Sequence, residues 1–240
     1  MATITSYGLA QEYRVVCGHC RAQAARLQGR GITEEKLTGG SDLIKIMQDT
    51  ETAALNAETA KELLTVQEET QRNGLSVLLR AVTNAVKKQF GKGAKEGKDF
   101  RVGEYLADST PKTLQWADDV AKAYPKYKDD LQKQGIMPTD IDSIKASAAA
   151  LEATDTQQET SKRIATQATA TANAAFDAVV KFVDAIHSAV TMEFVNEPAI
   201  RADFAAAKKL RYQAAPKPAK PNDKTDTNTA APPAQPGAPK

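Results

Sequence analysis

The chain has 240 residues, of which 41% are hydrophobic and 5% aromatic, and its formal charge at pH 7 is +2. Residues 213–240 contribute four Lys and two Asp, so residues 1–212 hold 28 basic and 28 acidic side chains. A nucleic-acid-binding protein is expected to have a dominant basic face, and this balanced charge argues against that class.

The first expected helix runs from Leu9 to Gln28 and is closed by Gly29-Arg30-Gly31. A long amphipathic helix is expected over residues 42–90, which contain no proline. It would begin after Gly39-Gly40, with Ser41 as its N-cap. Core candidates recur at three- and four-residue steps, as in a heptad seam. They are Leu43, Met47, Thr50, Ala54, Ala57, Leu64, Gln71, Leu75, Leu78, Val82 and Ala85. Many of them are small or polar, which predicts that the middle of this helix is its weakest part.

Residues 91–109, rich in Gly and Lys, are expected to be a connection rather than a packed element. A second short helix is expected from Pro111 to Gln134, with Thr110 as its N-cap. Pro125 lies inside this segment and is expected to kink or split the helix after Ala123, since proline removes a backbone donor.

A second long helix is expected over residues 139–195, with Thr139 as its cap and Pro198 just beyond its end. A short helix from Ala199 to Tyr212 would follow. The expected apolar stripe of the long helix comprises Ile141, Ile144, Leu151, Ile164, Ala168, Phe176, Val179, Val183, Ile186 and Val190. Residues 213–240 are rich in Pro, Ala and Lys without a hydrophobic pattern, which predicts a disordered tail.

The two halves of the chain indicate an internal duplication. A shift of 101 residues places Asn56–Leu63 over Gln157–Ile164, and a shift of 104 places Leu27–Ile32 over Leu131–Ile136. Two Ala- and Glu-rich helices could also align through composition alone. The matching corners, each with glycine before isoleucine, favour the duplication. It predicts that the first long helix continues through Gly74, with that glycine marking close packing; a hinge there is the alternative.

The resulting fold prediction is an all-α protein, an antiparallel helical bundle built from two tandem helical hairpins of one short and one long helix each. The expected parts are residues 1–90 as the first hairpin, 91–109 as a linker, 110–195 as the second hairpin, 196–212 as a short helix and 213–240 as the tail.

Cys17-Gly-His19-Cys20 is the sharpest local motif. Thiols at i and i+3 on a helix could form a redox pair or part of a soft-metal site, with His19 as a further ligand. His187 is expected to lie too far away to complete such a site. A c-type haem motif would need histidine where Arg21 stands. Buried or surface thiols without a chemical role are the simpler interpretation, and we expect no cofactor.

Trp116, Tyr124 and Tyr127 gather on the second short helix. They form either a local core patch or an exposed binding patch, because tyrosine and tryptophan favour interface hot spots. His187 lies beside Ile186 and is expected to be a packing histidine.

Two other candidate chemistries fail on their spacing. Residues 91–98 share glycine and lysine with a phosphate-binding loop, but Lys92 occupies a required glycine position. Adjacent acids such as Asp118 and Asp119 point about 100° apart on a helix, which makes them a solvated face rather than an acid/base pair.

The favoured function is therefore that of a non-enzymatic structural or protein-interaction bundle that binds a protein partner or itself. A redox or metal-binding bundle centred on Cys17 and Cys20 is the first alternative.

The Ala-, Thr-, Gln- and Glu-rich stripe resembles, in composition, the bundles of bacterial chemoreceptors and long-helix pore-forming toxins. A membrane-active protein, using the apolar runs Leu75–Phe90 and Phe176–Phe194, is the second alternative. Membrane contact is not favoured, because no apolar run reaches the ~18 residues of a spanning helix and no signal peptide is visible; a cytoplasmic location is expected.

Overall fold

The computed structural model describes residues 3–91, 93–104 and 109–214, and every regular element within them is helical. This confirms the predicted all-α class with two pairs of a short and a long helix. The predicted tail lies outside the described residues, apart from residues 213–214. The helices are α1 (Ser6–Ala22), α2 (Ala24–Leu27), α3 (Glu34–Phe90), α4 (Lys95–Asp99), α5 (Thr110–Lys133), α6 (Pro138–Glu193) and α7 (Pro198–Lys208), with 3₁₀ turns η1 (Gln28–Arg30) and η2 (Lys209–Tyr212).

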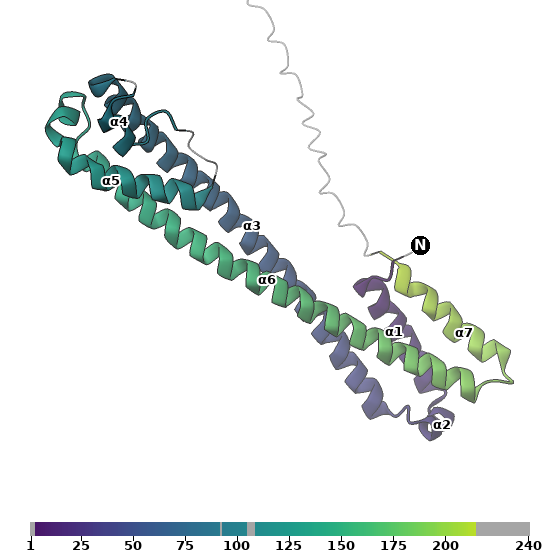
Figure 1. The fold of residues 1–240 in the computed structure, drawn as a ribbon. Helices are drawn as coiled ribbons and strands as arrows, with labels where there is room; N and C mark the ends of the chain where they lie inside the picture. The colour runs from purple at the N-terminus through teal and green to yellow at the C-terminus, as the bar shows by residue number, and fades with distance from the viewer. Residues whose placement is uncertain (1–2, 92, 105–108, 215–240) are drawn as a thin grey trace, which may run out of the picture.

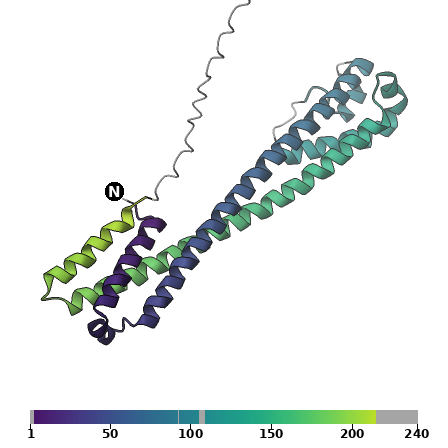
Figure 2. The same cartoon turned by 180° about the vertical axis from the view of Figure 1, so that it is seen from behind.

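The molecule is a rod with a helical head at each end (Figures 1 and 2). The long helices α3 and α6 run side by side in opposite directions, and α3 with its 57 residues is about 85 Å long. At one end, α1 and α7 pack on the start of α3 and the end of α6; we call this the terminal head. At the other end, α4 and α5 pack on the end of α3 and the start of α6; we call this the distal head. Residues 50–72 and 152–173, which join the heads, form the stalk.

Each head has its own hydrophobic core. The terminal core contains Leu9, Val16, Leu27, Met47, Val179, Val183, Ile186, Val190, Phe194 and Phe204. The distal core contains Leu75, Leu79, Val82, Val86, Phe100, Trp116, Val120, Leu131, Ile141, Ile144 and Leu151. The two long helices contribute to both cores and connect them through the stalk.

The duplication is visible in the buried residues of both the short and the long helices, at a single shift of 104 residues. Buried residues correspond at this shift as Val16 and Val120, Leu27 and Leu131, Leu37 and Ile141, Met47 and Leu151, Leu75 and Val179, Leu79 and Val183, Val82 and Ile186, Val86 and Val190, and Phe100 and Phe204. The predicted shift of 101 for the long helices is therefore wrong. These helices align at 104, the same shift that aligned the hairpin corners. The Phe100–Phe204 pair extends the repeat beyond the predicted hairpins. Phe100 directly follows α4 in the predicted linker, and Phe204 lies within α7.

The first long helix begins earlier than predicted. Thr33 is its N-cap and accepts a hydrogen bond from the Lys36 N–H (3.2 Å), so Gly39 and Gly40 lie inside the helix. Gly40 is where α3 approaches two other helices most closely. A Cβ atom there would come 2.6 Å from the Tyr13 hydroxyl oxygen and closer still to the Phe182 ring. Gly40 therefore serves packing rather than helix initiation.

This difference gives a matched pair of substitutions. Gly40→Ala is expected to destabilise the protein by about 1–3 kcal/mol, because the methyl group overpacks the junction. Gly39→Ala is expected to stabilise it by up to about 1 kcal/mol, since no atom lies within 4 Å and alanine is the better helix former. Urea unfolding of the two variants measures both effects. Equal changes in the two would contradict this account of the junction.

Other boundaries and contacts also differ from the sequence-based expectation. The second long helix is capped by Met137 with Pro138 in its first turn, rather than by Thr139. In α5 the non-helical residue is Tyr127, two positions after Pro125, rather than a break after Ala123. The first long helix does continue through Gly74, but a Cβ there would meet nothing within 4 Å, so that glycine does not mark close packing.

Candidate functional site

The densest polar cluster lies in the terminal head and is built on α1. The side chain of Thr5 caps this helix by accepting a hydrogen bond from the Gly8 N–H (2.9 Å). From that start, Leu9, Tyr13 and Val16 turn toward the core, and Glu12 lies on the same face with none of its surface exposed. A carboxylate buried in this way requires compensating donors.

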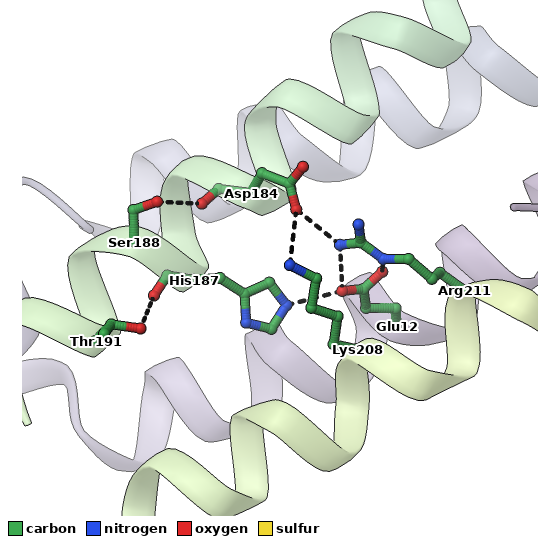
Figure 3. A network of polar contacts seen from close by, with 7 residues as sticks. All are labelled: Glu12, Asp184, His187, Ser188, Thr191, Lys208 and Arg211. Carbon is green, nitrogen blue, oxygen red and sulfur yellow. Dashed lines mark hydrogen bonds and ion pairs between the residues drawn. The ribbon is translucent and has the colours of Figure 1, made fainter.

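Donors from two other segments surround Glu12 (Figure 3). Arg211 of η2 donates through Nε to Oε2 and through Nη2 to Oε1, both at 2.7 Å. The Nε2 atom of His187 on α6 lies 2.7 Å from Oε1. Asp184, one turn before His187, accepts a second bond from Arg211 Nη2 at 2.9 Å, and Lys208 Nζ lies 3.8 Å from the same carboxylate. The cluster thus joins the first helix of the chain to its last described turn.

Main-chain contacts hold the same segments together. The Thr5 N–H donates to the Arg211 carbonyl (2.9 Å), and the Thr5 hydroxyl donates to the Gln213 carbonyl. At Gly8 a Cβ atom would come 2.6 Å from the Arg211 carbonyl oxygen, so glycine permits the approach of η2 to α1. The C-terminal segment is therefore fastened by both side chains and backbone.

The electrostatics of the cluster favour a fixed ion pair. Hydrogen bonds to Glu12 and Asp184 raise the pKa of Arg211 above its usual range, so its positive charge is retained. The hydroxyl groups next to His187 are engaged elsewhere, because Ser188 and Thr191 donate to main-chain carbonyls of α6 (Figure 3). The arrangement accordingly acts as a clamp on the C-terminal segment.

The predicted metal ligands lie in the same head but inside its core. Cys17 and Cys20 are both buried and unpaired, and His19 packs against the Phe204 ring with centroids 5.2 Å apart. Burial raises the pKa of the Cys20 thiol to about 12 and also raises that of Cys17. No group of three or more His, Cys, Asp or Glu side chains in the described part of the chain is arranged to hold a metal ion.

These thiols are expected to be unreactive in the folded protein. At pH 8 the thiolate fraction of Cys20 is roughly a thousandfold below that of a free thiol, so a disulfide reagent should label it slowly until the protein unfolds. Because the folded pKa lies above the unfolded one, the contribution of Cys20 to stability is complete below about pH 8.5 and is lost as the pH rises toward its folded value. Labelling of native thiols at the denatured rate would contradict this expectation.

The structure corrects the prediction of an exposed aromatic patch at Trp116, Tyr124 and Tyr127. Trp116 and Tyr124 are buried in the distal core, and Tyr127 packs edge-on against Phe90 while its hydroxyl donates to Asp99 (2.8 Å). Trp116 and Tyr124 are therefore core residues and Tyr127 is a half-buried residue against that core, the other interpretation that the sequence allowed.

Sequence reasoning missed Glu12, Asp184 and Arg211. A carboxylate on an apolar helix face was the available signal for Glu12, but its partners His187 and Arg211 are 175 and 199 positions away along the chain. The distance expected between His187 and the first helix was wrong for a related reason. That expectation counted residues from the corner of each hairpin. Antiparallel packing instead places the end of α6 beside the corner of the first hairpin, and His187 reaches Glu12 of α1.

None of the described helices is both long and apolar enough to cross a membrane. Comparison with protein families, with curated proteins and with solved structures gave no match to this chain.

Proposed function

We propose that this protein is a non-enzymatic structural protein that self-assembles through the outer face of α3 in its stalk. The observation that carries the proposal is a stripe of exposed aliphatic residues on that face. Leu55 and Leu63 are each 67% exposed, Val66 is 63% exposed, and Val77 continues the line toward the distal head. On a helix with 100° per residue they span about 80° of the circumference and about 33 Å of length.

The inner seam of the stalk has the opposite character. On α6 its buried residues are Thr154, Gln158, Ser161 and Ala165, while Ile164, predicted to face the seam, is 54% exposed. Gln158 Nε2 donates across the seam to the Thr65 hydroxyl (3.1 Å). An isolated helix pair is expected to bury its aliphatic residues and expose its polar ones. This inverted pattern supports a further helical layer over the outer face of α3.

The internal repeat provides a reference for that face. At the shift of 104, the residues Leu55, Leu63, Val66 and Val77 correspond to Glu159, Gln167, Ala170 and Lys181, all exposed on α6. The buried positions of the two heads match, whereas these outward positions are aliphatic on α3 and polar or small on α6. The apolar stripe is therefore a property of α3 alone and not of the repeat.

A second copy of the chain is the favoured occupant on energetic grounds. Burying the four side chains of one stripe would gain on the order of 5 kcal/mol, so two stripes packed together would gain about 10 kcal/mol. Association costs about 4–15 kcal/mol in lost freedom, so a gain of this size offsets the middle of that range and fits a reversible assembly. A single stripe against a polar partner surface would offset only the lowest part of it.

The alternatives draw less support from the structure. A redox or metal function would need accessible thiolates, and both thiols are buried. A membrane-active function would need the apolar runs of the long helices to be available. Val82, Val86, Val183 and Ile186, which belong to those runs, lie in the two cores.

Sedimentation analysis of a matched pair of variants tests the proposal. Wild-type protein is expected to form a reversible dimer, and Leu63→Glu/Val66→Glu is expected to weaken it at least about a hundredfold, since glutamates would lie in a desolvated interface. Gln167→Glu/Ala170→Glu, at the equivalent positions of α6, is expected to leave the dimer intact. Thermal unfolding of both variants checks that the fold is retained.

Two results would count against self-assembly through this face. One is a wild-type protein that stays monomeric at the highest concentration measured. The other is an equal loss of assembly in the α3 and α6 variants, which would place the interface elsewhere.

A further inference from the structure

A small pocket in the distal head lies where the terminal head has its charged clamp. The pocket has a volume of about 200 Å³ and is lined by Leu79, Arg80, Thr83, Arg101, Glu104 and Trp116. At the shift of 104, Trp116 corresponds to Glu12, Thr83 to His187, Arg80 to Asp184 and Glu104 to Lys208. The two sites are thus the same place in the two copies of the repeat.

The hydrogen-bonding roles are reversed between these sites. In the terminal head the short helix supplies a buried acceptor, Glu12, and the surrounding segments supply donors. In the distal head the short helix supplies a donor, the indole N–H of Trp116. The long helix places a guanidinium, Arg80, where the terminal head has the carboxylate of Asp184. Glu104, the one carboxylate among the described lining residues, lies beside Arg101, so the Trp116 N–H and the Arg80 guanidinium are the donors that an added acceptor would complete.

Among the described residues, the indole donor has no hydrogen-bond partner. Trp116 is only 6% exposed, and its Nε1 atom is buried without a hydrogen bond. An unpaired buried donor is rare in folded proteins and commonly marks a missing water, ion or ligand. Among the described residues, no carboxylate forms an ion pair with Arg80. Arg101 is held by Asp119 through contacts of 2.5 and 2.6 Å, and its Nη1 lies 3.8 Å from Glu104, so the pocket's own carboxylate is paired with Arg101.

We propose that this pocket binds a carboxylate supplied from outside the chain. One carboxylate oxygen would accept from the Trp116 indole N–H and the other from Arg80, in the manner of the Glu12 carboxylate in the terminal head. Charge-assisted bonds of this kind are the strongest that a neutral donor and a guanidinium can offer an anion. The volume lies below the ~300–1,000 Å³ typical of drug-sized ligands, which limits the occupant to a short carboxylate or to the end of one acidic side chain.

The chain contains a built-in reporter for this site. Trp116 is its single tryptophan, so protein labelled with ¹⁵N-tryptophan gives one indole N–H resonance. Titration with acetate or glutarate is expected to shift that resonance saturably, in the millimolar range, as the N–H gains an acceptor. Sodium chloride at the same ionic strength is the control for unspecific screening. A blocked peptide containing one glutamate, titrated in parallel, distinguishes a free small carboxylate from an acidic side chain of a partner.

Substitutions assign the shift to the pocket. Arg80→Gln is expected to weaken carboxylate binding about tenfold or more, because it removes the positive charge that faces the anion. Arg163→Gln, an arginine exposed on the stalk, is the matched control and should bind as the wild type does. Both residues are exposed, so neither change is expected to unfold the protein.

The proposal is overturned if no carboxylate shifts the resonance saturably, which would leave water as the partner of the indole. It is also overturned if Arg80→Gln and the wild type respond alike, or if chloride reproduces the shift. A resonance that moves in Glu104→Gln protein without added carboxylate would show that the chain supplies its own acceptor, again against the proposal. None of these outcomes depends on whether the stalk self-assembles.

Discussion

Replacing Arg211 with alanine is expected to destabilise the terminal head by about 3–5 kcal/mol. The variant leaves the fully buried carboxylate of Glu12 without its bidentate partner, and an uncompensated buried charge carries that cost. Asp184 would also lose its closest donor. Because η2 is fastened to α1 through this pair, the loss should release the C-terminal segment first.

The measurement combines two probes of unfolding. Far-UV circular dichroism follows all helices, whereas Trp116 fluorescence follows the distal head alone. In Arg211→Ala the dichroism transition is expected to begin at lower denaturant, while the fluorescence transition moves less. Arg21→Ala is the control, since the Arg21–Glu34 pair is exposed and such pairs contribute little. Equal behaviour of Arg211→Ala and Arg21→Ala would contradict the assignment of the clamp.

A double variant separates lost pairing from lost packing. Glu12→Met/Arg211→Met removes both charges while keeping much of the volume, and is expected to be more stable than Arg211→Ala. A double variant as unstable as Arg211→Ala would indicate that the side chain of Arg211 acts mainly through its packing.

Replacing Phe100 with alanine is expected to destabilise the distal head by about 3–5 kcal/mol. The ring is fully buried in the distal core beside Tyr127, and removing it leaves a cavity there. Because the polar seam of the stalk couples the two cores weakly, the terminal head is expected to remain folded. Unfolding should then become biphasic.

Phe204→Ala provides the matched comparison at the equivalent position of the terminal head. The Phe100 variant should shift the Trp116 fluorescence transition, and the Phe204 variant should shift the dichroism transition while leaving the fluorescence largely in place. If both variants shift both probes equally, the rod unfolds as one cooperative unit and the stalk couples the heads strongly.

Local signals in the sequence predicted the helices well and their ends less well. Periodicity identified both long helices, since a seam of apolar residues persists over many turns of α3 and α6. Helix starts were misplaced at Gly39-Gly40 and Thr139. A glycine pair has the same appearance whether it ends a helix or admits a neighbouring ring, and only the position of Phe182 distinguishes the two.

The clamp and the pocket lay beyond such signals. Glu12 could be noticed as a carboxylate on an apolar face, but its donors come from segments that only the fold brings near. The pocket beside Trp116 could not be predicted from the sequence, because its interpretation as an anion site rests on the equivalence of Trp116 and Glu12 in the repeat. That comparison requires the register of 104, and the alignment of the long helices by letters alone had suggested 101.

The sequence by itself determined the all-helical class and the two pairs of a short and a long helix, because these follow from periodicity along one segment. The tertiary structure decided that the two long helices lie side by side in opposite directions with the short helices at opposite ends, which gives two separate heads. It also decided which side of α3 is left bare and which polar groups meet in each head. These properties depend on how helices distant in the chain approach one another, and that approach is set by the summed packing of both copies rather than by any local pattern.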